Sequence, residues 1–541
     1  MPEATPQRRW RAACPNCGAP VEFASRASAS AVCGFCRSTL LRERGDSGET
    51  LSQIGQSAEV FEDYSPLQIG STGQWMGSGF AVVGRLQMQG SEGHWNEWHL
   101  LFDGGGDPPK VAWLSEDNGS FVLSLEVPLQ EAAPDPARLQ PGLPLNLAGQ
   151  RWSVAAVTPT RIAAAQGELP RPPQLRESFP VVELRNERDE VASLEWSSPG
   201  APSFSIGRAV PLAELRLQNL RVAATGESVS EASIQGRSFA CPSCGAPLAP
   251  KLAQTKSLAC GQCGAVVDVP APEARALGFT DQPPGAEPLI PLGRTGQLSV
   301  DPSRPAQPWQ VVGYQERCDL PDDAEDEQTF WREYLLFNQM EGFAFLVDTQ
   351  EGWSLVKPLT GAPSTGPGGV ARWAGTSFKP RWEQPYRAKV THVLGEFYWP
   401  VRLDQEALVT DYVSGDGRQL LSREATRDEV TWSHGRVLPA EEVRRAFSLP
   451  PQAAPTLQRD ASAFSKSGTS FFTVVVVSLL ILLVLVLVMR ALSRDSCQSY
   501  KDSFGEFSNE YQQCRSSLAR PSGSGYGGSW GGYSSGGGGH K

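Results

Sequence analysis

Eight of the eleven cysteines fall in two sets that share one spacing. Each set holds two Cys-x2-Cys pairs with fifteen residues between them, and the members are Cys14, Cys17, Cys33 and Cys36, then Cys241, Cys244, Cys260 and Cys263. Two such pairs on tight turns bring four thiolates to one point, which is the closed tetrahedral coordination of structural zinc. We therefore expect two zinc ribbons, at residues 10–42 and 237–268. A catalytic zinc is excluded because four cysteines leave no open coordination position, and an iron–sulfur cluster or a redox pair is the alternative.

The rest of the chain also repeats. The dipeptides of the first half and their later counterparts are Gly73-Gln74 and Gly296-Gln297, Gly167-Glu168 and Gly395-Glu396, Gly207-Arg208 and Gly435-Arg436. A shift that stays nearly constant indicates that one ancestral unit was duplicated whole. A residue that catalysis requires is then expected in both copies, so each copy serves as a check on the other.

Two pairs of glutamates pass this check. Glu97 and Glu333 both lie between aromatic residues, and Glu168 and Glu396 both follow a glycine. A carboxylate that tryptophan desolvates has a raised pKa and can act as a general acid. More often such a glutamate pairs with Arg or Lys across strands, and this is the interpretation we favour for all four.

Histidine fails the same check. None of the five histidines is repeated, and His99 has no counterpart, which excludes histidine base catalysis in both copies. The chain also lacks a phosphate-binding loop and an HExxH motif. We therefore assign no catalytic and no cofactor-binding residue besides the cysteines. An enzyme is the less favoured class, and it would take the form of one active copy around Glu97 or His99.

Short apolar runs broken by glycine, proline and acidic turns predict antiparallel strands in both copies. The predicted strands are residues 80–86, 95–102 and 112–116, then residues 309–314, 331–337 and 344–348. Each copy closes with a proline before helix formers, at Pro211–Leu215 and Pro439–Val443, which predicts one short terminal helix. Polar segments at 43–58 and 222–236 are predicted linkers. The fold class is mainly β, with tandem antiparallel β domains.

Two patterns are common to both copies. A glycine-containing opening strand and an aromatic W-x-E-[WY] strand are carried by Gly70 to Gly84 and Trp95 to Phe102, then by Gly293 to Gly313 and Trp331 to Phe337. The match continues in Gly167-Glu168 and Glu195-Trp196, then in Gly395-Glu396 and Glu424 to Gly435. In these patterns the chain resembles the family catalogued as domain of unknown function 4178, over residues 60–220 and 285–450. The resemblance implies an all-β domain that is often joined to ribbons or membrane helices, and it supplies no established activity.

An uncharged apolar run occupies residues 471–489. Nineteen residues at about 1.5 Å each span about 28 Å, close to the roughly 30 Å hydrocarbon core of a bilayer. We therefore expect a transmembrane helix at residues 471–490. The tail that follows, residues 491–541, is low in complexity and predicted to be disordered from residue 521.

The cysteines also bear on the orientation in the membrane. Thiolate zinc sites suit a reducing compartment, and no apolar stretch follows the charged first eleven residues, so no secretory signal is expected. The N-terminal domains are then cytoplasmic and the tail lies outside, where Cys497 and Cys514 could form a disulfide. The basic residues after the span weakly favour the opposite orientation.

The net charge of −11 disfavours a general nucleic-acid binder, although Arg8, Arg9 and Arg11 make the first ribbon locally basic. Tandem β domains without a shared catalytic set suit a scaffold that gains avidity from two similar surfaces. The sequence thus predicts a membrane-anchored scaffold or binding protein of unassigned pathway. It would tether a protein partner or a small ligand at the cytoplasmic membrane face. The alternatives are an enzyme with one active copy and nucleic-acid recruitment through the ribbons.

Overall fold

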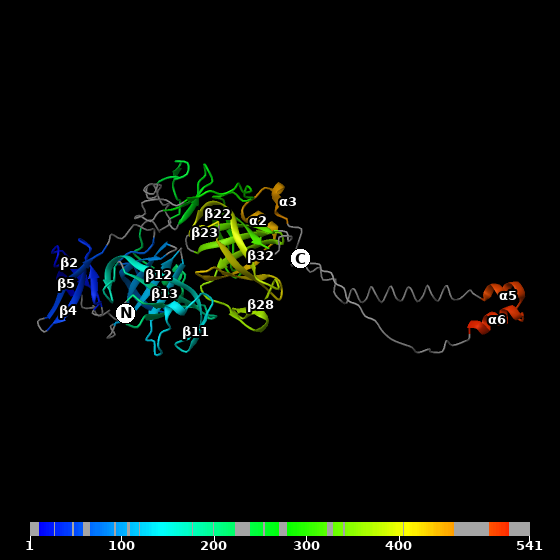
Figure 1. The fold of residues 1–541 in the computed structure, drawn as a ribbon, viewed down its shortest axis with the longest axis horizontal. Coiled ribbons are helices and arrows are strands. Elements are labelled where there is room, and N and C mark those ends of the chain that lie inside the picture. The colour runs from blue at the N-terminus through cyan, green and yellow to red at the C-terminus, as the bar shows by residue number, and fades with distance from the viewer. Residues whose placement is uncertain are drawn as a thin grey trace. The chain divides into compact units, whose positions relative to one another are not determined.

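The computed structural model describes most of the chain, and the residues form two compact units, Met1–Phe464 and Ser465–Lys541. The described residues are 10–25, 28–45, 48–57, 65–90, 93–104, 109–117, 120–175, 177–197, 200–221, 239–252, 255–269, 279–321, 328–338, 341–403, 405–458 and 497–518. Strands dominate the first unit, which confirms the mainly β fold class (Figure 1).

The first β domain, residues 65–221, is built on an antiparallel sheet that closes on itself. Its ring strands, in order of pairing, are β7 (Ser78–Gly90), β8 (Gly93–Phe102), β9 (Val111–Asp117), β10 (Ser120–Glu126), β15 (Ser203–Ala209), β14 (Glu190–Glu195), β13 (Ser178–Arg185) and β12 (Gln150–Leu169). The ring closes because β12 is long: residues 153–161 pair with β13, and residues 162–167 pair with β7. Two short strands, β6 (Thr72–Trp75) and β11 (Pro144–Leu147), add to β7 and β12.

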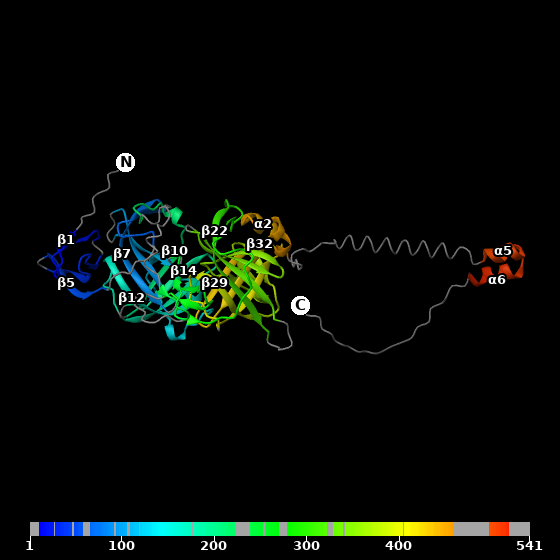
Figure 2. The ribbon, with the colours of Figure 1, turned by 90° about the horizontal axis from the view of Figure 1, so that it is seen from above.

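The second β domain, residues 282–458, repeats this ring strand for strand. Figure 2 labels β22, β29 and β32 of this ring, and β7, β10, β12 and β14 of the first. Its ring strands are β22 (Gln307–Leu320), β23 (Phe330–Asn338), β24 (Gly342–Thr349), β25 (Gly352–Pro358), β32 (Val430–Leu438), β31 (Gln419–Ala425), β30 (Glu406–Ser414) and β29 (Tyr386–Phe397). Here β29 pairs with both β22 and β30. The additional strands are β21 (Thr295–Leu298), β26 (Ser364–Thr365), β27 (Ala371–Trp373) and β28 (Thr376–Pro380). All the strands predicted from the sequence are therefore confirmed.

A pair of facing glycines lets the closing strands approach each other in both domains. Gly84 of β7 faces Gly167 of β12, and Gly313 of β22 faces Gly395 of β29. A Cβ atom on Gly84 would lie 1.9 Å from the carbonyl oxygen of Glu168. Gly167 and Gly395 also have positive φ angles of 71° and 82°, which L side chains rarely adopt. Packing and backbone conformation thus account for these repeated glycines.

Successive side chains along each strand point to opposite faces of the ring. On β8, Trp98 and Leu100 are buried in the hydrophobic core of the first β domain, whereas Glu97 points to the other face. The second β domain has its core on the matching face, around Tyr334 and Leu336. The larger apolar cores therefore lie on the outer face of these strands, and the inner face carries polar side chains such as Glu97 together with a smaller apolar cluster around Met88.

The predicted terminal helices are confirmed, with a difference in length. In the first β domain a 3-10 helix, η2 (Leu212–Leu215), follows Pro211, and in the second an α-helix, α2 (Ala440–Ala446), follows Pro439. Leu215 and Val443 are fully buried against the respective cores. Further short helices are η1 (Pro136–Arg138), η5 (Pro367–Gly369), η6 (Pro451–Ala453) and α3 (Ala454–Leu457).

Each cysteine set belongs to a small strand module that extends the sheet of its own β domain. The first four-cysteine module, residues 10–56, contains β1 (Trp10–Ala13), β2 (Pro20–Phe23), β3 (Ser30–Val32), β4 (Ser38–Gly45) and β5 (Gly48–Gln56). The second four-cysteine module, residues 239–280, contains β16 (Phe239–Ala240), β17 (Pro247–Leu248), β18 (Ser257–Ala259), β19 (Val266–Asp268) and β20 (Phe279–Thr280). Strand β3 pairs with β12, and β18 pairs with β29.

One predicted linker is wrong. Residues 43–58 were expected to connect the first ribbon to its β domain, but strands β4 and β5 form a hairpin there. The alternation of Leu41, Leu51 and their polar neighbours is sufficient for a paired strand that has a partner along its edge. The linker predicted at 222–236 lies outside the described residues.

The second unit contains a helical hairpin, α5 (Gln498–Phe504) and α6 (Asn509–Leu518). A disulfide joins Cys497 to Cys514, whose Cα atoms are 5.9 Å apart. Within the described ranges no helix has both the length and the apolarity needed to cross a bilayer. The predicted transmembrane segment at 471–490 and the low-complexity tail from residue 521 lie outside the described residues.

Candidate functional site

Each cysteine set forms one compact cluster of sulfur atoms. Within each set the four Sγ atoms lie within 4.8 Å of one another. The Sγ–Sγ distances are 3.7 Å for Cys14–Cys36, 3.7 Å for Cys17–Cys33, 3.8 Å for Cys241–Cys263 and 3.7 Å for Cys244–Cys260. Four thiolates with metal–sulfur bonds of about 2.3 Å in a tetrahedron lie about 3.8 Å apart. Both sets therefore fit a four-coordinate metal ion.

Tight turns hold these sulfurs in place. The residue after the second cysteine of a pair donates its amide to the carbonyl oxygen of the first cysteine and adopts a positive φ. Gly18, Gly245 and Gly264 take this position with a φ of 77°, a conformation that glycine adopts without strain. Arg37 takes it in the fourth turn with a φ of 60°. This turn lacks the glycine of the other three and is the strained one.

The glutamates that follow the repeated glycines anchor the four-cysteine modules. The buried Glu168 carboxylate accepts the amides of Ala24 at 2.6 Å and Ser25 at 3.2 Å. The Glu396 carboxylate accepts the amides of Lys251 and Leu252, both at 2.9 Å. The expected pairing with Arg or Lys across strands is thus wrong for both glutamates. Their role is to bind the backbone of the attached module, which explains why the duplicated unit retains them.

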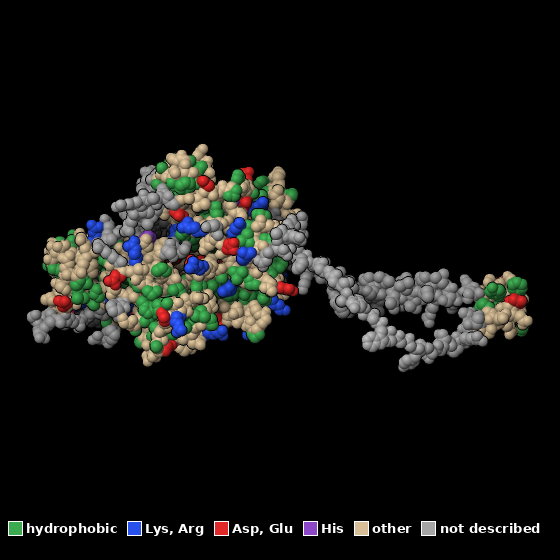
Figure 3. Space-filling model, in the orientation of Figure 1, with side chains coloured by type: hydrophobic (Ala, Val, Ile, Leu, Met, Phe, Trp, Pro, Cys, Tyr) green, Lys and Arg blue, Asp and Glu red, His purple; other side chains and the backbone are tan. Residues whose placement is uncertain are grey.

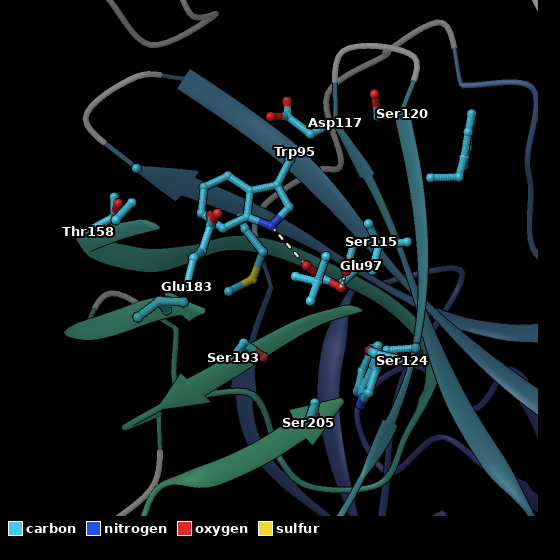
Figure 4. A pocket seen from close by; sticks show the side chains of 18 of the residues that line it. Trp95, Glu97, Ser115, Asp117, Ser120, Ser124, Thr158, Glu183, Ser193 and Ser205 are labelled. Atoms are coloured by element: carbon cyan, nitrogen blue, oxygen red, sulfur yellow. Dashed lines mark hydrogen bonds between the residues drawn. The ribbon is translucent and has the colours of Figure 1, made fainter. Parts of the chain in front are cut away.

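The inner face of the first β domain lines most of a cavity of about 620 Å³, and residues of the second four-cysteine module and the second β domain, such as Lys256 and Lys357, complete it. Glu97 of β8 points into it, and its carboxylate accepts hydrogen bonds from the Trp95 indole at 2.9 Å and the Ser115 hydroxyl at 2.6 Å (Figure 4). Glu183 of β13 and Glu195 of β14 line the same cavity. A volume of this size is in the range of small-molecule sites.

No basic side chain of the described residues forms a salt bridge with Glu97 in this cavity. The pKa of Glu97 is raised to about 7, mainly by burial and also by the neighbouring Glu195 and Glu183, while the two hydrogen bonds oppose the shift. Burial also raises the pKa of Glu195. The basic side chains on the wall have other partners, in the pairs Arg171–Glu126, Arg185–Glu183, Lys256–Asp117 and Lys357–Glu341. Among the described residues no Lys or Arg forms a salt bridge with Glu97 or Glu195.

The second β domain fills the equivalent place with an arginine. In the first domain Met88 faces Trp95 across the strands, and in the second Arg317 faces Trp331. Arg317 is 7% exposed, and its guanidinium donates two hydrogen bonds to Glu424, at 2.8 and 3.1 Å. A third goes to Glu333 at 3.3 Å. For Glu333 the expected pairing with a cross-strand arginine is confirmed.

Three carboxylates on the inner face of the first ring have counterparts in the second. Leu86 faces Glu97 where Gln315 faces Glu333, so the two glutamates are equivalent. Val191 faces Gly207 where Leu420 faces Gly435, and Glu195 and Glu424 each lie four residues further along. Glu183 and Asp411 pair with the equivalent serines Ser193 and Ser422. The two rings therefore keep three acidic positions, and they differ in the cation.

The model of one family, described as a domain of unknown function (DUF4178), matches residues 68–212 and 305–440, which together make up more than half of the chain. The chain belongs to this family. Its two DUF4178 domains coincide with the two closed rings, inside the bounds predicted from the sequence. No curated protein and no solved structure matches the chain.

The structure does not bring Glu97 and His99 into one active site. His99 is 1% exposed and does not line the cavity; its ring lies 5.0 Å from that of Trp113, which does. Burial lowers the pKa of His99 to about 4, and Nδ1 lies 3.1 Å from the carbonyl oxygen of Glu168. Glu97 is the member of that pair with access to a ligand.

Sequence reasoning missed Glu183, Glu195 and Arg317 as members of the inner face. Glu195 was noticed only as part of a shared pattern. The alternation of side chains along each strand could have found them, because each lies on the same face of the sheet as the repeated glutamate of the W-x-E-[WY] pattern.

The basic residues of the first four-cysteine module are largely neutralised where the structure describes them. Arg11 pairs with Glu22, and Arg42 pairs with Glu49 and lies over the ring of Trp10. Arg8 and Arg9 lie outside the described residues. On the face of the first unit that Figure 3 shows, basic and acidic side chains are interspersed. Nucleic-acid recruitment through the ribbons stays a prediction.

Proposed function

We propose that the protein is a membrane-anchored receptor that binds a small ligand in its first DUF4178 domain. The observation that carries the proposal is a difference between the two rings. In the first, Glu97 lines a cavity of about 620 Å³, which residues of the second domain also line, and in the second Arg317 occupies the position equivalent to Met88. A buried acidic group without a cation destabilises a fold. Its retention therefore indicates a function. The second domain then has a structural or partner-binding task.

The two metal ions are proposed to be structural zinc. Four thiolates at tetrahedral spacing are the donors that zinc prefers, and they leave no position for a substrate. Each ion would stabilise a module whose strands are short. The hydrogen bonds of Glu168 and Glu396 would then attach the ordered module to its ring. The four-cysteine modules thus have a structural role in the receptor.

The anchor is proposed to be residues 471–490, with the DUF4178 domains on the cytoplasmic side and the tail outside. Eight metal-binding thiols suit a reducing compartment, and the Cys497–Cys514 disulfide suits an oxidising one, so the two kinds of cysteine favour opposite sides of one membrane. Protease added to sealed, right-side-out vesicles should remove the tail and leave residues 10–458 intact. Digestion of the DUF4178 domains under these conditions would contradict this orientation.

Native mass spectrometry tests the receptor function. The full chain is extracted from its own membranes in mild detergent, and the mass of each ion is compared with that of the chain plus zinc. Ser193 lies on the cavity wall, so Ser193→Trp fills the site, and Ser303→Trp on an exposed loop is the control. We expect an extra small-molecule mass on wild type and Ser303→Trp but not on Ser193→Trp. Absence of such a mass from all three proteins, or its retention by Ser193→Trp, would sink the proposal.

A further inference from the structure

We infer that the cavity of the first DUF4178 domain recognises a guanidinium group, supplied either by a small molecule or by an arginine side chain of a polypeptide. This inference rests on the proposed receptor function and names the chemistry of its ligand. The evidence is internal to the chain, because the second domain shows how the same ring binds a guanidinium of its own.

Arg317 is the template. Its guanidinium makes a two-pronged contact with the Glu424 carboxylate, a third hydrogen bond to Glu333, and lies 5.6 Å from the centre of the Trp331 ring. Planar two-pronged contact with carboxylate and stacking on an aromatic face are the features that distinguish guanidinium recognition from that of a simple ammonium. Trp331 in turn donates its indole N–H to Glu333 at 2.7 Å, which fixes the carboxylate.

The first domain retains every acceptor of this arrangement. Trp95 donates to Glu97 at 2.9 Å, as Trp331 does to Glu333, and Glu195 lies at the position of Glu424. What it lacks is the cation, because Met88 stands at the position of Arg317 and Leu86 at that of Gln315. Both replacements are apolar and both line the cavity.

Comparison of the inner faces of the two rings shows that the first lacks the arginine and keeps its acidic partners. A domain that had only lost the arginine would be expected to lose its acidic partners too, because buried carboxylates without a cation destabilise the fold. Glu97 and Glu195 are instead kept, and space is open beside them. The first ring is therefore complementary to a group of the shape and charge that the second ring carries on its own chain.

A metal ion is a poorer fit to the same residues. Calcium requires six to eight oxygen ligands, and the wall beside Glu97 presents indole, thioether and aliphatic groups from Trp95, Met88 and Leu86. Trp95 also offers a ring face, which favours a delocalised organic cation over a strongly hydrated ion.

Titration calorimetry on the full chain in detergent tests the inference. The probes are agmatine, the tripeptide Gly-Arg-Gly with blocked ends, and its citrulline counterpart, which replaces the guanidinium by a neutral urea of the same shape. We expect agmatine or the arginine peptide to bind and the citrulline peptide to bind at least about tenfold more weakly. The tighter of the first two identifies the source of the guanidinium.

Two variants locate the site. Met88→Arg should install the arrangement of the second domain, so that the chain occupies its own cavity and added guanidinium no longer binds. Glu97→Gln should weaken binding about tenfold or more, and Glu383→Gln, on an exposed residue of the second domain, should leave it unchanged. If Met88→Arg does not fold, the Glu97→Gln result still decides.

The inference is overturned if neither guanidinium probe binds, if the citrulline peptide binds as well as the arginine peptide, or if Glu97→Gln and Glu383→Gln behave alike. Failure here is separable from failure of the receptor function. If the guanidinium probes fail while wild type retains a compound that Ser193→Trp loses in native mass spectrometry, the receptor stands and its ligand is of another class. If no compound is retained either, both proposals fall.

Discussion

The two DUF4178 domains have the same ring of strands, and they differ in what the ring contains. Both keep the facing glycines, the terminal helix and a glutamate that binds the attached four-cysteine module. On the inner face, the second domain surrounds Arg317 with Glu333 and Glu424, and the first leaves Glu97 and Glu195 beside a cavity. Duplication has therefore preserved the scaffold in both copies while separating a filled interior from an open one.

This difference shows how a repeat can report on a ligand. Residues shared by both copies, such as Gly167 and Glu168, are explained by packing and by module attachment. Residues that differ at equivalent positions, above all Met88 and Arg317, point to function. Identical residues in the two copies therefore indicate shared structure, and residues that differ at equivalent positions are the better guide to function.

The largest effect is expected at the metal centres, where a structural zinc contributes on the order of 10 kcal/mol to the order of a small module. Cys33→Ser and Cys260→Ser should each reduce the metal content from two zinc ions per chain to one, measured by elemental analysis. The second four-cysteine module should become protease-sensitive throughout, since its β19–β20 pairing covers two residue pairs where the β4–β5 pairing of the first module covers eight.

Cys318→Ser is the matched control, because Cys318 is buried in β22, away from both sulfur clusters. It should retain two zinc ions. Two zinc ions in either ligand variant would contradict the assignment of a metal to that cluster.

The next largest effect is expected at Arg317. Arg317→Met gives the second domain the residue of the first and leaves Glu333 without its cation, which should destabilise that domain by about 3 kcal/mol. Hydrogen exchange measured by mass spectrometry should show faster exchange in β22 and β23, with β7 and β8 unchanged. Met88→Leu, a volume-conserving change, should cost less than about 1.5 kcal/mol. Equal effects of the two variants would remove the contrast between the domains.

Substitution of the equivalent glutamates should have effects of opposite sign. The pKa of Glu97 is about 7 in the folded state against an ordinary value of 4.5, so the folded state binds more protons, and stability falls as pH rises from about 4.5 to 7. Gln cannot ionise, and Glu97→Gln should therefore raise the stability of the first domain by about 1 kcal/mol above pH 7 and leave it unchanged below pH 4.5.

Glu333→Gln instead removes a partner of Arg317 and should destabilise the second domain by about 2 kcal/mol. Thermal denaturation of both variants at pH 5 and pH 8 provides the comparison. Since Glu183 and Glu195 also contribute to the pKa of Glu97, Glu195→Gln should lower that pKa and flatten the pH dependence. A pH-independent difference between Glu97→Gln and wild type would show that Glu97 is ionised throughout.

The smallest effect is expected where the four-cysteine modules attach. Glu396→Gln loses the charge of the hydrogen bonds to the amides of Lys251 and Leu252, and Glu168→Gln does the same at Ala24. Each change should cost about 1 kcal/mol and speed hydrogen exchange at these amides. Glu383→Gln is the control. Unchanged exchange at these amides would mean that the strand pairing β3–β12 and β18–β29 holds the modules without the glutamates.

Local sequence was sufficient to predict the strands and the cysteine clusters. Trp95 to Phe102 alternates between the two faces, and Cys14 and Cys17 are set on their turn by three residues of spacing. These features depend on contacts between near neighbours, which periodicity and motif spacing describe. The terminal helices after Pro211 and Pro439 belong to the same class.

The contents of the rings could not be predicted in the same way. That Glu195 shares a cavity with Glu97 depends on closure of the ring, through pairing of β12 with β7. The facing of Arg317 and Trp331 depends on a register shift between Val311 and Gly313 that the sequence does not announce. The same distance in sequence hid the contact of Glu168 with Ala24, which is made 144 residues away.

The most direct test of the central claim is the number of guanidinium ligands bound per chain, measured by native mass spectrometry with whichever of agmatine and the blocked arginine peptide binds more tightly. Wild type should bind one, in the first domain. Arg317→Met should bind two, because the second ring then has the acidic partners of Arg317 and an empty place for its guanidinium. A stoichiometry of one for both proteins, with Arg317→Met shown to be folded by hydrogen exchange, would contradict the claim that Arg317 stands in the second domain where the ligand stands in the first.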